Sequence, residues 1–384
     1  MKILHTSDWH IGKRLVNKER IFEQEKVLDE IAEICDRENI ELVLIAGDIF
    51  DTYTPSAEAE ELFYKKIKKI AGENRAVLAI SGNHDDGVRL SAVSPLAEEQ
   101  GVYIVGNSRL AISLSDTDRK IKPVLSGKGY AVFQNEKGER AYIGMLPYPN
   151  EARFKEEKSE LPYIERMQGW LNESMAGNTE NLPSVLMAHI FVAGGKVSLG
   201  EREIDLGGAR AVPVTALPKC DYIALGHLHK KQRMGENCFY SGSPLQYAFD
   251  EVADKSVKAF DLTANGVENA REIPLGSGTK LVRVRAENLE MAETLLKMYE
   301  SSFVELTLRL TEPLTTTASA TLASYPNLIS TVIELHADDA QEFTSRKNLS
   351  HGELFDAFYQ SVYGVEPKAE LKELFLTALA ETQE

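Results

Sequence analysis

The sequence predicts an α/β fold in which two mixed sheets face each other and helices cover their outer faces. At the start of the chain, short apolar runs alternate with segments whose apolar residues recur at helical spacing. This is the pattern of parallel strands joined by right-handed crossovers. In the middle of the chain, further apolar runs predict a second sheet. Two facing sheets would bring both sets of strand ends to one rim.

The first sheet is expected from four apolar runs, three of which lead into helices. Ser56 stands just before the second of these helices and is a plausible N-cap, with Pro55 beside it. The expected elements are, in order, a strand at 2–5, a helix at 18–38, a strand at 42–46, a helix from 54 to about 70, a strand at 76–80, a helix at 91–100 and a strand at 102–105.

The second sheet is expected from residue 131 onward. Two strand-like runs flank Asn135–Gly138, which is a hairpin signal. A helix at 161–175 interrupts the series of strands. The expected strands are at 131–133, 141–146, 184–188, 222–225, 238–241 and 257–260.

The composition changes near Pro274–Gly278, which predicts a linker. His336, beyond it, is expected to be structural or exposed. Apolar residues recur at helical spacing in 354–379, which predicts either a docking surface for another chain or packing back on the same domain. The predicted domains are residues 1–275 for the two sheets, 276–340 for a small α+β capping domain, and 345–384 for a C-terminal helical hairpin.

The bulk composition is that of an ordinary globular protein, with 384 residues, 43% hydrophobic and 27% charged. No run of 18 apolar residues occurs, and the N-terminus enters a strand at once, so we expect a cytoplasmic protein. The cysteines Cys35, Cys220 and Cys238 lack CxxC spacing, which argues against a disulfide framework and against a thiolate zinc site.

The net charge of -16 taken alone counts against a nucleic-acid partner, because phosphate contacts need Lys and Arg. The net charge is, however, a total for the whole chain, and one part of its surface can still be basic. Basic clusters occur at 13–14, at 65–69 and at 230–233, and the last directly follows a pair of histidines. A local basic groove therefore stays compatible with the acidic total.

Five predicted strands end at residue types that bind metals. Two pairs, Asp8 with His10 and His227 with His229, are spaced two apart, so both members of a pair can turn toward one ion in an extended loop. His5 lies within the first strand and is expected to be a core or supporting residue. The candidates are Asp8 and His10 after the first strand, Asp48 after the second, Asn83, His84 and Asp85 after the third, His189 after a fourth, and His227 and His229 after a fifth.

Carboxylate, imidazole and amide donors without a thiolate favour two divalent cations such as manganese, iron or zinc. Asp48 could bridge them through its two oxygens, and Asn83 offers an amide oxygen. Two such ions, about 3.5–4 Å apart, clamp a phosphoester and lower the pKa of a bridging water, which then acts as the nucleophile. The pattern therefore predicts a dinuclear phosphoester hydrolase.

The sequence resembles the calcineurin-like metallophosphoesterases. The motifs that carry the resemblance are Asp8-Trp9-His10, Gly47-Asp48-Ile49-Phe50-Asp51, Gly82-Asn83-His84-Asp85, His189 and Gly226-His227-Leu228-His229. The runs Met1–Lys13, His189–Gly195 and Tyr240–Leu245 are similar to those of nucleases that pair with a long coiled-coil ATPase. This narrower likeness covers the whole chain.

The resemblance implies two manganese ions and a ligand set for each. One ion would be held by Asp8, His10, Asp48 and His229, and the other by Asp48, Asn83, His189 and His227. His84 would not be a ligand but would stabilise the transition state or protonate the leaving 3′ oxygen. Asp85 would either orient His84 or cap the following helix.

Two arginines and one acidic residue could influence how the substrate approaches. Arg89 and Arg202 are placed where relatives could approach backbone phosphate, and salt-bridge roles are equally compatible with the sequence. Asp86 departs from the family pattern, which often has Ser-Pro after the Asn-His-Asp run, and this extra carboxylate could alter the approach of substrate.

The implied activity is 3′–5′ exonucleolytic cleavage of duplex DNA together with endonucleolytic cleavage of single strands and hairpins, in repair, replication and recombination. The implied assembly is a homodimer within a heterotetramer, and the ATPase would contact 354–379. The chain has no Gly-rich phosphate loop, so ATP binding would come from the partner. A small-molecule phosphodiesterase or phosphatase, or a DNA-tethering scaffold with a vestigial site, are the alternatives.

Overall fold

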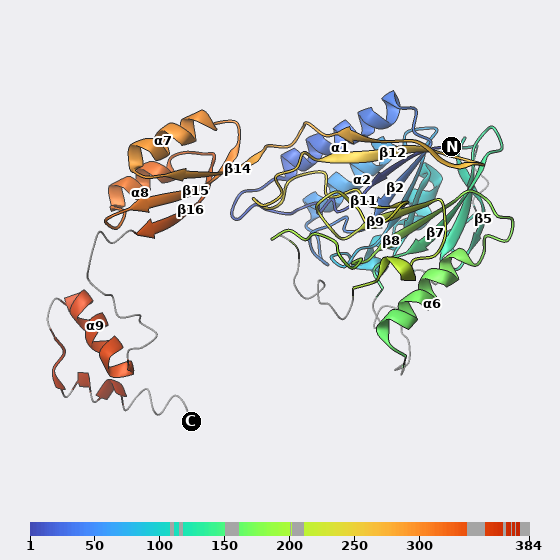
Figure 1. The fold of residues 1–384 in the computed structure, drawn as a ribbon. Helices are drawn as coiled ribbons and strands as arrows, with labels where there is room; N and C mark the ends of the chain where they lie inside the picture. Colours follow the sequence, from blue (N-terminus) through green and yellow to red (C-terminus); the bar gives the residue numbers. More distant parts are fainter. Residues whose placement is uncertain are drawn as a thin grey trace. The chain divides into compact units, whose positions relative to one another are not determined.

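The computed structural model describes residues 1–107, 111–114, 118–149, 161–199, 201, 211–335, 350–363, 366–369, 371–372 and 374–376. The chain divides into two compact units. The first is formed by Met1–Leu308 with Thr316–Val332, and the second by Arg309–Thr315 with Ile333–Glu384. Figure 1 shows the elements of each.

The first sheet has six strands in the order β13-β12-β1-β2-β3-β4. The strands β1 to β4 run parallel, whereas β12 pairs antiparallel with β1 and β13 pairs antiparallel with β12. The sheet is therefore mixed. Its strands are β1 (Lys2–Thr6), β2 (Leu42–Ala46), β3 (Ala76–Ile80), β4 (Val102–Val105), β12 (Ser256–Thr263) and β13 (Gly266–Pro274).

The second sheet has seven strands in the order β10-β11-β9-β8-β7-β6-β5. The four strands β7, β8, β9 and β11 are parallel, and antiparallel pairs stand at both ends of the sheet. Its strands are β5 (Lys122–Gly127), β6 (Tyr130–Gln134), β7 (Arg140–Leu146), β8 (Ser184–His189), β9 (Tyr222–Gly226), β10 (Gln232–Arg233) and β11 (Cys238–Tyr240).

The two sheets face each other across a shared core, with helices outside (Figure 1). Successive side chains of a strand point to opposite faces, so each central strand contributes to two cores. In β2, Val43 packs under the helices α1 (Ile21–Arg37) and α2 (Ala57–Ala71), whereas Leu44 packs between the sheets. On the other side, α6 (Tyr163–Met175) covers the second sheet. The predicted sandwich of two mixed sheets is confirmed.

Local sequence signals explain most of these elements. The hydroxyl of Ser56 accepts a hydrogen bond from the backbone N–H of Ala59, as its predicted role as N-cap requires. The prediction of a single helix at 91–100 is wrong. The chain forms α3 (Gly87–Ser91), α4 (Ser94–Ala97) and a 3₁₀ turn at Glu98–Gln100 instead, because Pro95 can occupy only the first turn of a helix.

A third, three-stranded sheet has the order β14-β15-β16. The strands β14 (Leu281–Ala286) and β15 (Phe303–Leu310) pair in parallel, and the chain between them forms α7 (Leu289–Met298). The N-cap of α7 is Asn288. The short helix α8 (Thr316–Ala323), which was not predicted from the sequence, precedes β16 (Leu328–Leu335). The predicted domain limits at 275 and 340 stay predictions.

The C-terminal segment contains α9 (His351–Tyr363) and helical residues at 369, 371–372 and 374–376. Phe355 of α9 stacks on Phe375 with ring centroids 4.3 Å apart, so the apolar faces of the two segments contact each other. His336 lies outside the described residues. In the described part of the chain, no helix is both long and apolar enough to cross a membrane.

Candidate metal centre

The loops that follow β1 and β2 run side by side and carry the first candidate ligands. The backbone N–H of Asp8 donates to the carbonyl of Gly47 (3.0 Å), and that of His10 donates to the carbonyl of Asp48 (3.0 Å). These bonds continue the parallel pairing of the two strands past their ends. The loops after β3, β8 and β9 reach the same place, and they bring the side chains of Asn83, His189 and His227 into contact.

Four of the candidate ligands have a backbone conformation that residues other than glycine rarely adopt. Their φ angles are positive: 55° at Asp8, 43° at His10, 51° at Asp48 and 111° at His227. Such residues cost on the order of 1–3 kcal/mol each and cluster at functional sites. Gly82 allows the loops to pack closely, because a Cβ there would lie 2.1 Å from Oδ1 of Asp48.

The rings of His10 and His229 meet at an angle, with their Nε2 atoms directed toward each other. Their Nε2 atoms are 3.0 Å apart, and both side chains are buried. Behind His229, Nδ1 lies 3.2 Å from Oε1 of Glu251, and behind His10, Nδ1 lies 3.4 Å from Oδ1 of Asp51. Protons on the two Nδ1 atoms would leave two Nε2 lone pairs directed at each other.

The rings of His189 and His227 both face the amide of Asn83. Oδ1 of Asn83 lies 2.9 Å from Nε2 of His189 and 2.9 Å from Nδ1 of His227. Nδ1 of His189 donates to the carbonyl of Ala46 (2.8 Å), which leaves the lone pair of the neutral ring on Nε2. Nε2 of His227 is buried and has no hydrogen-bond partner among the described residues.

Asp48 lies between these two groups. Its Oδ2 is 3.5 Å from Nε2 of His10 and 3.4 Å from Nε2 of His189, whereas its Oδ1 accepts the backbone N–H of His84 (2.8 Å). Oδ2 faces both groups, whereas Oδ1 accepts one hydrogen bond and keeps a second lone pair. That Asp48 bridges two ions through its two oxygens therefore stays a prediction.

The donor set fits divalent cations. Around Oδ2 of Asp48, ring nitrogens and oxygens converge, and when the rings are neutral on that side their lone pairs repel unless a proton or a cation lies between them. The 3.0 Å between Nε2 of His10 and Nε2 of His229 matches two adjacent ligands of one ion, for metal–nitrogen distances of about 2.0–2.1 Å. Asp8, Asp48 and His189 also place one ligand atom each within 4.8 Å of one another.

Electrostatics in the metal-free cluster point the same way. Burial raises the pKa of Asp8 to about 7. Burial alone would lower the pKa of His189, but the charge of Asp48 and its hydrogen bond raise this pKa to about 9. Burial opposes ionisation of Asp48, yet the neighbouring rings, His189 first, hold its pKa well below the usual value. A bound cation would replace the protons held at Asp8 and His189.

His84 lies at the edge of the cluster. One ligand atom each of His10, Asp48 and His84 falls within 4.8 Å of the others, so distance alone does not exclude His84 as a ligand. Its Nδ1 donates to the carbonyl of Asp51 (2.7 Å). His5 is elsewhere, in the core between the sheets, where its ring contacts Tyr222 and burial lowers its pKa to about 3.

The predicted role of Asp85 as a helix cap is wrong, and its role in orienting His84 stays a prediction. Its carboxylate accepts the backbone N–H groups of Ile49 (3.1 Å), Phe50 (2.9 Å) and Gly82 (2.8 Å), so it ties the Asp48 loop to the Asn83 loop. The chain entering Asp85 from β3 points that carboxylate inward, toward the donors of the neighbouring loop.

The helix cap is Asp86 instead, whose side chain accepts from the N–H groups of Val88 and Arg89 at the start of α3. The guanidinium of Arg89 pairs with Glu60 at 2.8 Å, as the salt-bridge alternative predicts. Arg202, the other arginine singled out in the sequence, lies outside the described residues.

The residues that support the ligands were not predicted from the sequence. Glu251 supports His229, and the carbonyl of His10 accepts a hydrogen bond from Gln24 (2.9 Å). The hydroxyl of Tyr247 donates to the carbonyl of Trp9, and its ring lies edge-on to His10. Asp51 belongs to one of the motifs that carry the family resemblance, but Glu251 and Tyr247 follow no recognisable pattern.

Comparisons with known proteins identify the family of this chain. The family model described as calcineurin-like phosphoesterase matches residues 1–231. Three relatives are named as the SbcD component of the nuclease SbcCD. That of Bacillus subtilis is 33% identical over 406 aligned residues, covering 100% of this chain and 99% of the relative. That of Rhodobacter capsulatus is 32% identical, covering 83% of each chain. That of Staphylococcus epidermidis is 27% identical, covering 94% of this chain and 93% of the relative.

The family match spans the strands β1 to β9 and every candidate ligand, and the first relative is aligned over nearly its full length. The chain therefore belongs to the calcineurin-like phosphoesterase family and, within it, to the SbcD group of metal-dependent phosphodiester hydrolases.

Proposed function

We propose that this chain is the nuclease component of a complex of the SbcCD type, which cuts DNA with two bound Mn²⁺ ions. The observation that carries the proposal is the placement of Oδ2 of Asp48 between two groups of donors, 3.5 Å from Nε2 of His10 and 3.4 Å from Nε2 of His189. The proposed cleavage is exonucleolytic from 3′ ends of duplexes and endonucleolytic on single strands and hairpins.

In this proposal the two donor groups each hold one ion. The His10 half consists of Asp8, His10 and His229, the Asn83 half consists of Asn83, His189 and His227, and Asp48 belongs to both. When bound, the two ions would polarise a phosphodiester and supply hydroxide near neutral pH by lowering the pKa of coordinated water. The protein's own contribution is to fix the seven donors in advance, through positive φ angles and backbone hydrogen bonds.

His84 is proposed to act on the leaving group rather than on an ion. The hydrogen bond from its Nδ1 to the carbonyl of Asp51 fixes the ring and leaves Nε2 as the atom that can transfer a proton to the 3′ oxygen. The backbone N–H of His84 is held by Oδ1 of Asp48, so the ring is positioned by the same carboxylate that serves both halves. A gain of about 10²–10⁴ in rate is typical of such general-acid catalysis.

The proposed partner is SbcC, because the relatives are named as one component of the nuclease SbcCD. Its proposed docking site is the C-terminal segment, where Phe358 and Leu374 are exposed. A partner that contributes DNA contacts and ATP binding would reconcile the net charge of -16 with a DNA substrate. A homodimer of this chain within a heterotetramer completes the proposed assembly.

The test is manganese-dependent cleavage of a labelled DNA hairpin and a labelled linear duplex, with and without SbcC and ATP. His84→Gln is expected to lose cleavage while still binding two ions per chain. The control is Arg89→Gln, whose wild-type guanidinium already pairs with Glu60 and which should therefore cleave normally. Metal content is measured on the same samples.

A small-molecule phosphodiesterase with the same metal centre predicts a different result. The wild-type chain with SbcC, ATP and Mn²⁺ would leave both DNA substrates intact and hydrolyse a p-nitrophenyl phosphodiester. That outcome would keep the metal centre and overturn the assignment to DNA.

A further inference from the structure

A buried carboxylate, Glu251, stands behind the ring of His229. It is 2% exposed, and its Oε1 lies 3.2 Å from Nδ1 of His229 and 3.4 Å from the hydroxyl of Ser198. Glu251 and His229 are far enough apart in the chain that only the fold brings them together. An ionised carboxylate is acceptor-only, so it fixes the proton of the neutral ring on Nδ1.

Lys255 holds Glu251 in its charged form. The ammonium group of Lys255 contacts Oε2 of Glu251 and donates to the carbonyl of His229 (2.9 Å) and to the hydroxyl of Ser243 (2.8 Å). A buried charge is costly unless it is paired and hydrogen-bonded. The two residues therefore contact His229 at two places, Glu251 at the ring and Lys255 at the backbone carbonyl.

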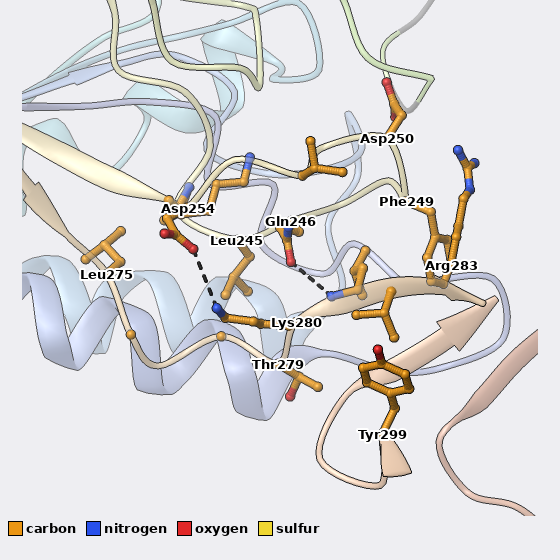
Figure 2. A pocket seen from close by; sticks show the side chains of 17 residues that line it. Leu245, Gln246, Phe249, Asp250, Asp254, Leu275, Thr279, Lys280, Arg283 and Tyr299 are labelled. Carbon is orange, nitrogen blue, oxygen red and sulfur yellow. Dashed lines mark hydrogen bonds and ion pairs between the residues drawn. The ribbon is translucent and has the colours of Figure 1, made fainter. Parts of the chain in front are cut away.

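The loop that carries Glu251 is itself fixed. The amide of Gln246 donates to the carbonyl of Glu251 and accepts the backbone N–H of Leu281 (3.0 Å) at the start of β14. The loop also lines a cavity of about 680 Å³ (Figure 2), in which Gln246 bonds to Leu281 of β14 and Asp254 pairs with Lys280, the residue before that strand. Glu251 does not line this cavity, so its carboxylate is directed to the ligand cluster.

We propose that Glu251, paired with Lys255, is a positioning residue that directs Nε2 of His229 at the metal ion of the His10 half. The inference rests on the proposed function, because it takes His229 to be a metal ligand. A proton held on Nδ1 places the lone pair on Nε2, the atom that lies 3.0 Å from Nε2 of His10. A carboxylate partner also makes the imidazole a stronger ligand.

The neighbouring residue provides a matched control. Asp250 has the same charge and lies in the same loop, but its carboxylate pairs with Lys230 (2.9 Å) and accepts the backbone N–H of Leu199 (3.1 Å). These contacts direct it away from the ring of His229, which Glu251 supports. Asp250→Asn thus removes one negative charge beside the cluster and leaves the ring of His229 supported.

The experiment is a titration of the metal-free full-length chain with Mn²⁺, followed by electron paramagnetic resonance. Wild-type chains and Asp250→Asn are expected to bind two ions and to show a spin-coupled pair. Glu251→Gln is expected to bind one ion about 10–100-fold more weakly, as is typical when an outer-shell partner is removed, and to show an isolated ion at limiting Mn²⁺.

A second variant separates positioning from folding. Glu251→Gln leaves Lys255 without its charged partner, so loss of metal in that variant could follow from unfolding. The double variant Glu251→Leu with Lys255→Met replaces the pair by apolar side chains of similar size, and it should remain folded by circular dichroism. It should still show weakened binding of one ion and normal binding of the other.

The inference would be overturned if each of the two ions bound to Glu251→Gln and to the folded double variant as tightly as it binds to the wild-type chain. That result would leave the proposed nuclease function intact. Conversely, wild-type chains that bind two ions but do not cut DNA would overturn the function, while the titration would still measure what Glu251 does to His229. The two failures are therefore distinguishable.

Discussion

The two halves of the metal centre are built from similar rings but supported in different ways. In the His10 half, the carboxylate of Glu251 lies 3.2 Å from Nδ1 of His229, and that of Asp51 lies 3.4 Å from Nδ1 of His10, which has no hydrogen-bond partner among the described residues. In the Asn83 half, a backbone carbonyl stands behind His189, and Nε2 of His227 has no hydrogen-bond partner in the part of the chain that the structure describes. Carboxylate support makes an imidazole a stronger ligand.

The charges of the ligands also favour tighter metal binding by the His10 half. The His10 half contributes the carboxylate of Asp8, whereas the corresponding oxygen of the other half is the neutral amide of Asn83. Affinity for a divalent cation rises with the number of charged ligands. We therefore expect the His10 half to fill first and the Asn83 half to exchange its ion more readily, so that the second ion limits activity at low metal concentration.

The largest effect should come from Asp48, because its Oδ2 is the one atom that faces both halves. Asp48→Asn removes the shared charge and replaces one oxygen by a nitrogen that donates but does not accept. Cleavage should fall by at least about a thousandfold, well beyond the 10–100-fold typical of an outer partner. Inductively coupled plasma analysis should find fewer than two ions per chain. Two tightly bound ions with normal cleavage would contradict the shared role.

A smaller change should make the two halves more alike. Asn83→Asp adds a negative charge to the weaker half, so the second Mn²⁺ should bind about ten- to a hundredfold more tightly, while the first changes little. Isothermal titration calorimetry resolves the two events. Asn265→Asp, in an exposed turn, adds the same charge away from the cluster and serves as the control. If the first ion rather than the second gained affinity, the assignment of the weaker half would be reversed.

Metal binding to the Asn83 half should also depend on pH. In the metal-free protein the pKa of His189 is raised to about 9, so below that pH an incoming ion must displace a proton from this ring. Affinity therefore rises with pH, by about tenfold per unit for one proton between about pH 7 and 9, and levels off above. In the His10 half, burial lowers the pKa of His10 to about 3, so that ring is already neutral, whereas at His229 the hydrogen bond and charge of Glu251 outweigh burial and raise the pKa. Mn²⁺ titrations between about pH 7 and 9 measure how the affinity for the second ion changes with pH. An affinity for the second ion that did not change with pH would refute this prediction.

The sequence located the loops that carry the candidate ligands because the strands before them are buried on both faces. In β2 and β3 every residue is buried, so each strand reads as an unbroken apolar run that stops at its polar loop. The edge strand β13 lacks this signal. In β13 most side chains are half-buried or exposed and many are charged, so this strand was not predicted. An apolar run thus locates strands that are buried on both faces, including β4 at the other edge of the sheet, but not a strand whose side chains are mostly exposed.

The supporting residues could not be predicted for a different reason. Glu251 reaches His229 only because the loop after β11 folds back over the cluster, and no spacing in the sequence records that return. Asp85 and Asp86 were also indistinguishable by type. Which of the two caps α3 depends on the direction of the chain as it leaves β3, and this is a property of the packed loops.

The smallest predicted effect separates these two neighbouring carboxylates. Asp86→Ala removes the N-cap of α3 and should lower the free energy of unfolding by about 1 kcal/mol, a typical value for a lost cap, with cleavage unchanged. Asp85→Asn should cost more and also weaken metal binding, because Ile49, Phe50 and Gly82 donate to that buried carboxylate. Urea unfolding and cleavage assays on both variants provide the measurement. If Asp86→Ala changed the KM for DNA without changing stability, the residue would act on the approach of substrate rather than as a cap.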